Sequence, residues 1–500
     1  MSNERHRLAS RRGLLRAALG AAGLAAAAPL LQACGAAPAA PTAEPKVVER
    51  VVTQVVEKPV EKVVTQVVEK PVEKVVVVTA TAAPKAAAAG EISWWAWGNE
   101  QTGFPAWRKQ IDLFNKKFPA VKVNLQPGLG YDKIAVAMAA GTAADVIMIN
   151  MPSGYAFIGH GNIINLQPYI NGDKGWQDDI KTFHAGSIDA YTFRGDLYAI
   201  PQSLETTGTI YNEDMVKDAG LKPPAELGDQ WTWDKFLEYA GKMTKGNGPD
   251  KVYGAFVSPD PQSGLGDLAY PLGARWVKDN GIETGVDAKE FVQAADFLVD
   301  FVKKGFAPQP SALAAQQVNN YAMFVNLKIG LMLSGDWAFG WVLTRQLPDK
   351  KFKMDWAPSP RAPNGKYAAI GHYVAQGGYE RSKNKDAVVG FMREYATKAS
   401  QEEITNNWEN YPALAPRLDA GDYFWNKKLI PNEKGLRASF EANQPYPRTP
   451  VGDVSPIVVS PTNTALNAVM DGKETRKTDD VLKELAKKIN DDLAKSAKSL

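Results

Sequence analysis

Aromatic and hydrogen-bonding side chains follow several stretches of the sequence that predict β-strands. A planar aromatic ring offers a face for stacking, and amides and carboxylates offer hydrogen-bond donors and acceptors. Together they suit the non-covalent binding of a small polar molecule. These residues are Trp97, Asn99 and Glu100 after the first predicted strand, Asn150 and Tyr155 after the third, and Asp336 and Trp337 after a later, buried one.

Motifs for bond-making chemistry are absent from the sequence. There is no G-x-S-x-G, no H-E-x-x-H and no P-loop. The chain has one Cys and four His, which excludes an internal disulfide, a multi-Cys zinc site and a His-rich metal centre. We therefore expect a protein that is not an enzyme, with no cofactor and no metal.

Alternating strands and helices are predicted to position the strand-end residues. Strands are expected over residues 91–97, 121–125 and 145–149, with helices over 106–118 and 131–140. The last strand, DVIMI, is continuously apolar, as in strands buried on both faces. This β-α-β-α-β order predicts a parallel α/β sheet, and ligands bind such sheets beyond the carboxyl ends of the strands.

Further elements are predicted along the rest of the chain. Residues 193–201 resemble a hairpin, and the amphipathic pattern of 289–304 is typical of a helix. Strands are also expected over 209–212, 252–257 and 329–333, and helices over 213–219, 233–244, 386–396 and 479–494.

Composition separates the first 90 residues from the remaining 410. All 48 aromatic residues lie after Gly90, and a segment without aromatics cannot easily build a core. The whole chain carries a net charge of +3, but residues 91–500 carry −2, which argues against a nucleic-acid binder. Residues 91–500 are long enough for two domains.

The N-terminus reads as an export signal. Arg11-Arg12 precede an uncharged, Ala-rich stretch over residues 17–31, and the pair resembles a twin-arginine signal; a general export signal is the alternative. The only Cys, Cys34, lies in a segment that resembles a bacterial lipobox. We expect a signal peptide over residues 1–33 and a lipid on Cys34, which anchors the protein to the membrane without a transmembrane helix.

Residues 34–90 are expected to form a low-complexity stalk. VVTQVVEKPVEK occurs twice in succession over residues 51–74, with one Pro in each copy. The repeat has no aromatic residue and no Leu, and Pro disfavours both helix and central strand. An extended spacer is the simplest interpretation, with a β-type or coiled-coil assembly element as the alternative.

From residue 91 to about 490 the chain resembles the family 1 extracellular solute-binding proteins of carbohydrate ABC importers, the group that includes the maltose-binding proteins. Seven motifs in the same order carry the resemblance. They are WWAWG (94–98), FNKKFP (114–119), YDKIAVAMAAGTAADVIMIN (131–150), LYAIPQSLETTGTIYNEDMVKDAGL (197–221), WTWDKFLEYAGKMT (231–244), IGLMLSGDWAFG (329–340) and NAVMDGKET (467–475).

The resemblance implies an α/β, two-lobed periplasmic-binding-protein-like fold with a ligand cleft between hinge-linked lobes. Lobe one would hold residues 91–206 and 371–400, lobe two would hold 209–365 and 401–500, and the hinge would include 207–212. In family terms Glu205 matches a sugar-binding carboxylate and Trp337 a stacking Trp. Further candidates are Gln202 before the hinge, Gly371, His372 and Tyr373 on the returning segment, and Trp276, Trp408 and Tyr411 in loops.

The implied function is capture of a carbohydrate by a lipid-anchored, monomeric receptor that delivers it to the permease subunits of an ABC transporter. The receptor would lie on the extracytoplasmic face of the cell membrane. A polyol or glycerol-phosphate ligand is the alternative, although a phosphate favours Arg and Lys, which the strand-end motifs lack. An exported carbohydrate-active enzyme, with two carboxylates flanking the glycosidic bond, and a surface adhesion module stay open as less favoured functions.

Overall fold

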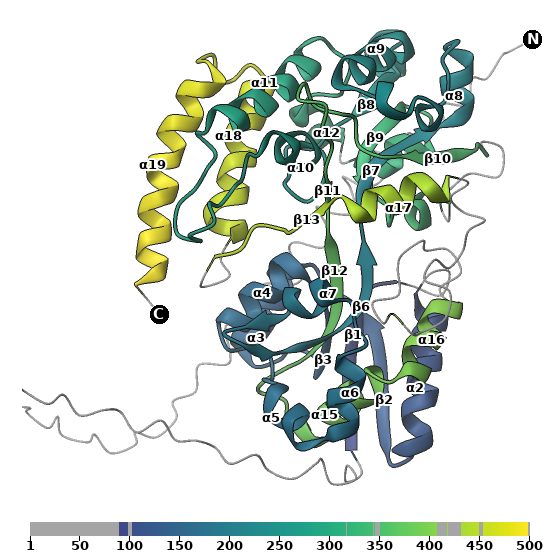
Figure 1. Ribbon diagram of the computed structural model, residues 1–500, viewed down its shortest axis with the longest axis vertical. Coiled ribbons are helices and arrows are strands. Elements are labelled where there is room, and N and C mark those ends of the chain that lie inside the picture. Colours follow the sequence, from purple (N-terminus) through teal and green to yellow (C-terminus); the bar gives the residue numbers. More distant parts are fainter. Residues whose placement is uncertain are drawn as a thin grey trace, which may run out of the picture. The chain divides into compact units, whose positions relative to one another are not determined.

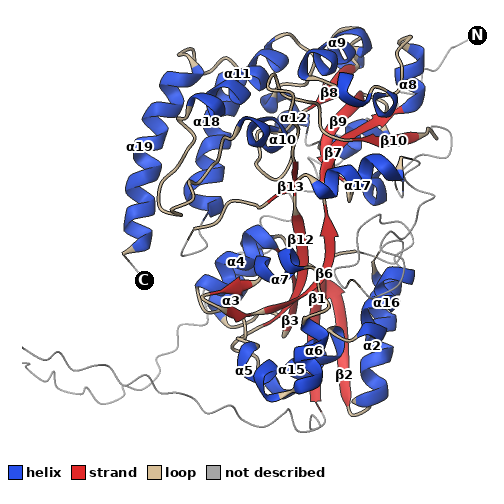
Figure 2. Ribbon diagram, in the orientation of Figure 1, coloured by secondary structure: helices blue, strands red, loops and turns tan. Residues whose placement is uncertain are grey.

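The computed structural model describes residues 90–498, apart from 99–102, 317, 344, 346–350, 408–417, 419–431 and 450–453. The expected signal peptide, Cys34 and most of the stalk lie outside the described residues, as do Asn99, Glu100, Trp408 and Tyr411. Figure 1 shows the described elements in two lobes, and Figure 2 shows helices on the flanks of the strands in each.

A five-stranded sheet with the order β2-β1-β3-β12-β6 forms the first lobe. β1 pairs in parallel with β2 and β3, whereas β12 runs antiparallel to β3 and β6. Every residue of β3 is buried, as its continuous apolar sequence predicts. The strands are β1 (Gly90–Ala96), β2 (Val121–Pro127), β3 (Val146–Asn150), β6 (Ala199–Glu205) and β12 (His372–Gly378).

Helices cover this sheet and bring together segments that are far apart in the sequence. On α2 (Phe104–Lys117), Trp107 and Phe114 are buried, and Phe114 packs edge-on against Phe391 of α15 (Lys385–Tyr395). The other helices are α3 (Tyr131–Ala140), α4 (Met151–Gly159), α5 (Gln167–Gly172), α6 (Lys174–Ile180), α7 (Ala185–Ala190) and α16 (Lys398–Asn407). A short hairpin joins β4 (Thr192–Phe193) and β5 (Asp196–Leu197).

The second lobe is built on a four-stranded sheet with the order β10-β7-β9-β8. β7 is antiparallel to both of its neighbours, and β8 is parallel to β9. α9 packs directly on β8 because Gly254 has no side chain. A Cβ at this position would clash with the backbone of Ala240. The strands are β7 (Thr207–Asn212), β8 (Tyr253–Phe256), β9 (Ile329–Gly335) and β10 (Met354–Ala357).

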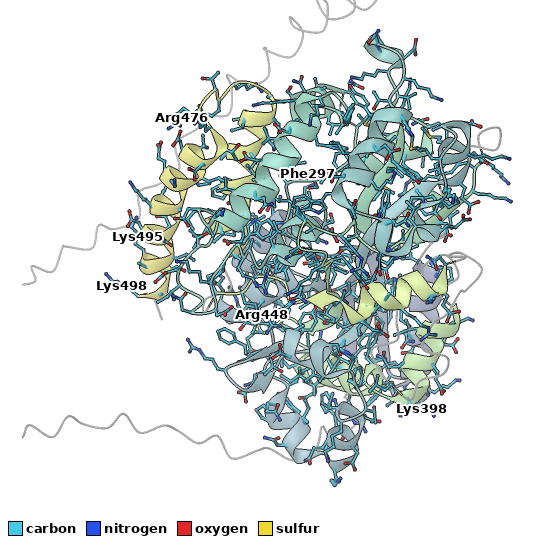
Figure 3. The ribbon with its side chains drawn as sticks, turned by 45° about the horizontal axis from the view of Figure 1, so that its top comes forward. Phe297, Lys398, Arg448, Arg476, Lys495 and Lys498 are labelled. Atoms are coloured by element: carbon cyan, nitrogen blue, oxygen red, sulfur yellow. The ribbon has the colours of Figure 1, made fainter. Side chains whose placement is uncertain are left out.

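Helices surround this second sheet, and α11 shows why they pack there. Its buried residues, among them Phe291, Leu298 and Val302, lie on one stripe of the helix. α19 is amphipathic too, and it exposes basic side chains such as Lys495 (Figure 3). The helices are α8 (Glu213–Asp218), α9 (Trp233–Met243), α10 (Leu265–Ala269), α11 (Lys289–Lys303), α12 (Pro310–Gln316), α13 (Asn320–Val325), α14 (Ala338–Leu343), α17 (Glu433–Glu441), α18 (Ser460–Met470) and α19 (Thr478–Ala497).

Among the described residues, two neighbouring chain segments cross between the lobes. β6 leads into β7 through Thr206, and β11 (Ala369–Ile370) leads into β12 through Gly371 (Figure 1). His372 pairs with Glu205 across the two segments, so both crossings lie side by side. β11 also pairs with β13 (Asn443–Gln444), which joins the crossing to α17.

A buried carboxylate, that of Asp267 on α10, stabilises the hinge formed by the two crossing segments. It accepts hydrogen bonds from the hydroxyls of Thr207 at 2.5 Å and Ser359 at 2.6 Å, and from the backbone amide of Gly264 at 2.8 Å. The hydroxyl oxygen of Thr207 in turn accepts from the backbone amide of Ile370. Burial, only partly offset by these hydrogen bonds, raises the pKa of Asp267 from 3.8 to about 7.

Asp267 therefore makes the stability of the protein depend on pH. Because its pKa is higher in the folded state, its contribution is complete below about pH 4 and is lost as the pH rises through about 7. Asp267→Asn is expected to cost about 1–2 kcal/mol at pH 5, since the amide cannot accept all three hydrogen bonds. Relative to wild type, the variant should gain about 2 kcal/mol between pH 5 and pH 8.

Urea unfolding of both proteins at pH 5 and pH 8 measures this difference. Parallel pH profiles for variant and wild type would show that Asp267 is ionised throughout the range, against the prediction.

The predicted fold class, α/β with two hinge-linked lobes, is confirmed. The opening β-α-β-α-β order is also found, as β1, α2, β2, α3 and β3. The segment that returns to lobe one, expected near 371–400, is followed into α16, which runs to Asn407 and packs on α2. Gln110 of α2 and Ser400 exchange hydrogen bonds of 2.6 Å, which hold α16 to the first lobe.

Candidate functional site

Glu205 and His372 form a buried pair where the two crossings meet. Glu205 is 2% exposed and His372 is 4% exposed, and Nδ1 of His372 lies 2.9 Å from Oε2 of Glu205. A carboxylate can only accept here, so Nδ1 carries the hydrogen and donates it. Nε2 then faces the side-chain amide nitrogens of Gln262 at 2.8 Å and Asn150 at 3.5 Å, from which it can accept.

Asp336 and Trp337 enter this cluster from the second lobe, at the end of β9. The backbone amide of Asp336 donates to the carbonyl of Thr206 at 3.0 Å, which ties the strand end to the hinge. The Trp337 ring lies over Gly335, where an added Cβ would come within 1.9 Å of the ring. Its centroid is 5.1 Å from that of the His372 ring, and its Nε1–H donates to the Tyr321 hydroxyl at 2.9 Å.

Asp336 is completely buried, and its charge is not matched by a hydrogen bond. Among the described residues, neither carboxylate oxygen has a partner at normal geometry. The backbone amides of Thr206, Trp337 and Asp336 itself lie near enough to lower its pKa. Burial first, and then the charge of Glu205, outweigh them and raise the pKa of Asp336 well above its usual range.

The first lobe contributes Asn150 and Trp97 through a short chain of contacts. Asn150 caps α4, with its side-chain oxygen accepting from the backbone amide of Ser153. The backbone amide of Asn150 donates to the Tyr131 hydroxyl at 3.1 Å, and the Tyr131 ring meets Trp97 edge-on at 5.5 Å. Trp97 and Asn150 are thus joined to the cluster, as their places at strand ends predict.

Arg448 reaches from the segment after β13 to the first lobe (Figure 3). Its guanidinium lies 2.9 Å from the Asp189 carboxylate and 5.4 Å from the centre of the Tyr155 ring. Tyr155 also packs edge-on against Phe193. The structure therefore places the predicted residue Tyr155 beneath an arginine that bridges the lobes, in contact with neither Glu205 nor His372 in any described interaction.

Two predicted residues, Gln202 and Trp276, are buried within a lobe and are not brought to the cluster. Gln202 is the extra residue of a β-bulge opposite β12, and its side-chain oxygen accepts from Gln376 and Tyr395 inside the first lobe. Trp276 is fully buried in the second lobe, between Tyr270 and Phe291. The place of Gln202 before the hinge and that of Trp276 in a predicted loop reveal neither burial, so we leave both out of the candidate site.

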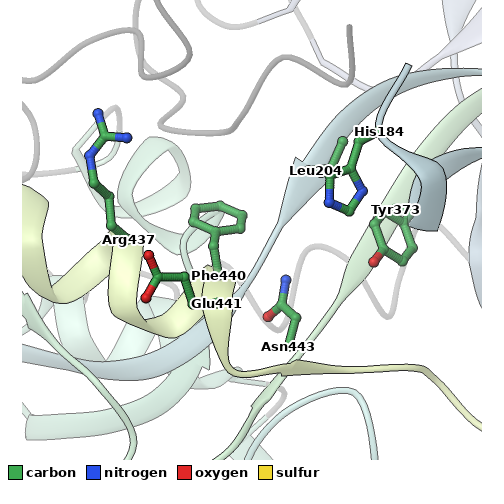
Figure 4. A pocket seen from close by; sticks show the side chains of 7 residues that line it. All are labelled: His184, Leu204, Tyr373, Arg437, Phe440, Glu441 and Asn443. Atoms are coloured by element: carbon green, nitrogen blue, oxygen red, sulfur yellow. The ribbon is translucent and has the colours of Figure 1, made fainter. Parts of the chain in front are cut away.

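Tyr373 points away from the cluster because successive residues of a strand face opposite sides of the sheet. It follows His372, and together with Leu204 it lines a separate cavity of about 420 Å³. Figure 4 shows both beside His184, facing Phe440 and Glu441 of α17, with Asn443 between them. Gly371 belongs to the crossing itself, where its backbone amide donates to the carbonyl of Gln444 at 2.9 Å.

Sequence reasoning missed Tyr131, Asp260 and Gln262. Asp260 accepts from the backbone amide of Gln262 at 2.7 Å and so holds the loop that carries Gln262 to His372. This loop follows the predicted strand 252–257, and the strand-end rule that selected Asp336 could have found both residues. Tyr131 gave no such signal, since it begins a predicted helix.

Among the described residues, no group of three or more His, Cys, Asp or Glu side chains is arranged to hold a metal ion. None of the described helices has the length and apolar character to cross a bilayer.

Residues 97–402 match the family described as bacterial extracellular solute-binding protein. A mannitol-binding protein of Pseudomonas aeruginosa is 26% identical over 50% of this chain and 59% of its own length. An arabinooligosaccharide-binding protein of Bacillus subtilis is 23% identical over 55% of this chain and 61% of its own length. The chain thus spans about three fifths of these curated relatives.

Solved structures share the fold at low sequence identity. An ABC substrate-binding protein from Listeria monocytogenes in complex with cycloalternan has a TM-score of 0.68 and 23% identity, and the match covers 81% of this chain and 100% of that one. A solute-binding protein from Thermotoga lettingae bound to tagatose has a TM-score of 0.66 and 20% identity, with 81% and 100% covered.

Proposed function

Since the chain belongs to the bacterial extracellular solute-binding proteins, we propose that it captures a carbohydrate and delivers it to the permease of an ABC importer. The observation that carries the proposal is the cluster at the lobe junction. There the Trp337 ring lies beside His372, and Glu205 and Asp336 offer carboxylate oxygens. A sugar has C–H faces for the ring and hydroxyls for the acceptors.

Relatives support this class of ligand by what their names say they bind: mannitol and arabinooligosaccharides among the curated proteins, cycloalternan and tagatose in the solved structures. The mannitol-binding relative makes a polyol the second candidate. A phosphate ester is disfavoured, because the cluster has two buried carboxylates and no described Lys or Arg bonded to Asp336 or His372.

The cellular setting follows from the sequence as part of the same proposal. The family is extracellular by description, and the protein would be exported by the twin-arginine signal and held to the membrane by a lipid on Cys34. The stalk over residues 34–90 would separate the anchor from the lobes. The receptor would work as a monomer, without catalysis, with Trp97, Asn150, Glu205, Asp336, Trp337 and His372 as its ligand-binding residues.

A thermal-shift screen of the purified protein against neutral sugars, polyols and glycerol phosphates tests the proposal. A ligand that binds only the folded state stabilises it, by about 2.7 kcal/mol at a hundred times its dissociation constant. A sugar or polyol that raises the melting temperature and is recovered unchanged supports a receptor. A shift from phosphate esters or peptides alone would overturn the ligand class, and conversion of the sugar would overturn passive capture.

A further inference from the structure

The carboxylate of Asp336 is the least satisfied polar group of the candidate site. It is 0% exposed, and neither of its oxygens has a hydrogen-bond partner at normal geometry among the described residues, although the backbone amides of Thr206, Trp337 and Asp336 lie near. A buried carboxylate with so little hydrogen bonding is costly unless it takes up a proton or meets a positive charge. Both of its oxygens can accept further hydrogen bonds.

Neighbouring side chains add negative rather than positive charge. The Glu205 carboxylate acts directly on Asp336 and disfavours its ionisation. Asp260 is partly buried and lies near enough to His372 for the two to interact electrostatically. Glu205 already accepts from His372 and from the hydroxyl of Ser203, and Asp260 accepts from Gln262 and Asn463.

Arg448 and Arg275 are engaged with other partners. Arg448 is paired with Asp189 and lies over Tyr155, and Arg275 lies over the Tyr270 ring at 4.8 Å while it donates to the carbonyl of Ala274. No described Lys or Arg forms an ion pair with Asp336 or Asp260. The carboxylates of Glu205, Asp336 and Asp260 thus lie close to the Trp337 and His372 rings without a described Lys or Arg to balance them.

We propose that the captured carbohydrate carries a protonated amine, whose N–H groups donate to the two oxygens of Asp336 beside the Trp337 ring. This inference rests on the proposed function and names the ligand class of the same site: an amino sugar or an aminated polyol. An ammonium supplies several donors and the missing positive charge together, whereas a hydroxyl supplies one donor and no charge. The ring face of Trp337 also attracts cations.

Ligand binding is then linked to a proton. Burial and the charge of Glu205 of β6 raise the pKa of Asp336, and a bound ammonium lowers it again. The other titratable groups here contact the neighbouring Trp337 ring: His372 of β12 and Tyr321 of α13. The ammonium favours the ionised carboxylate, so binding is expected to release a proton from Asp336. Affinity for the aminated ligand therefore rises with pH until the amine itself loses its proton, and affinity for a neutral sugar does not.

Calorimetry with matched ligands tests the proposal: glucosamine against glucose and N-acetylglucosamine, the β-1,4-linked glucosamine disaccharide against cellobiose, and 1-amino-1-deoxymannitol against mannitol. At least one aminated ligand should bind about 10-fold or more tightly than its neutral partners. Asp336→Asn should reduce that ratio to about twofold or less. Asp355→Asn, which removes another buried carboxylate of the second lobe, should leave the ratio unchanged.

A second measurement needs no variant. Titration of wild type in two buffers with different ionisation enthalpies should show a proton released with the aminated ligand and none with its neutral partner. If neutral ligands bind as tightly as aminated ones and release no proton, the proposal of an aminated ligand is wrong. The proposed capture of a carbohydrate is unaffected by that result. Failure of every ligand in all three sets would instead count against the proposed function itself.

Discussion

Replacing Trp337 by alanine is expected to weaken binding of the captured carbohydrate by about 30- to 100-fold. The indole is the large aromatic face of the cluster, held in place by Gly335 beneath it and by the Tyr321 hydroxyl at its Nε1. Loss of a central aromatic anchor in a binding site costs about 2 kcal/mol or more, and 1.4 kcal/mol is a factor of ten in affinity. Isothermal titration with the ligand found in the thermal-shift screen measures the change.

Two variants control for this substitution. Trp337→Phe keeps a flat ring and should lose less than about fivefold in affinity. Trp341→Ala removes the indole of α14, which is 44% exposed and stacks on Tyr321, and should change affinity less than about threefold. If wild type and a folded Trp337→Ala protein bind the ligand with equal affinity, the Trp337 ring is not part of the binding site.

Gly254→Ala is expected to produce the largest loss of stability, about 3 kcal/mol or more. An added Cβ would lie 1.8 Å from the carbonyl oxygen of Ala240, which is backbone and cannot rotate away. α9 would have to move off β8, and overpacking that shifts backbone costs about 1–3 kcal/mol, occasionally more. The midpoint of urea unfolding, followed by tryptophan fluorescence, should fall accordingly.

Gly130→Ala is the matched control. No atom lies within 4 Å of the added Cβ at Gly130, and its φ of −63° suits any residue. Its cost should stay below about 1 kcal/mol, since Gly130 only precedes the first turn of α3. A Gly254→Ala protein as stable as Gly130→Ala would mean that α9 adjusts freely to the extra methyl group.

The strand-end residues show what can be predicted from the sequence. Asn150, Asp336 and Trp337 follow strands whose apolar runs are easy to recognise, and the structure gathers all three near His372. Trp276 shows the limit of the same reasoning. An aromatic side chain in a loop can serve a core or a surface equally well, and only its contacts with Tyr270 and Phe291 decide between them.

The face of the sheet to which each strand residue points is a second feature that the sequence does not predict. Glu205 and Leu204 are adjacent, as are His372 and Tyr373, yet the first of each pair faces the cluster and the second faces the 420 Å³ cavity. A shift of the strand pairing by one residue would turn every side chain to the opposite face of the sheet. The sequence carries the alternation, but the register between β6 and β12 and the bulge at Gln202 set its phase.

The sequence alone determined that an aromatic-free N-terminal part precedes an α/β protein with polar and aromatic residues at its strand ends, because composition and apolar periodicity are local properties. The tertiary structure alone decided which of those residues meet. Glu205 and His372 are 167 positions apart, and Asp336 joins them from another sheet. The burial and mutual repulsion of Glu205 and Asp336 exist only once the lobes bring the two carboxylates together, because charge interactions depend on distance and on the exclusion of water.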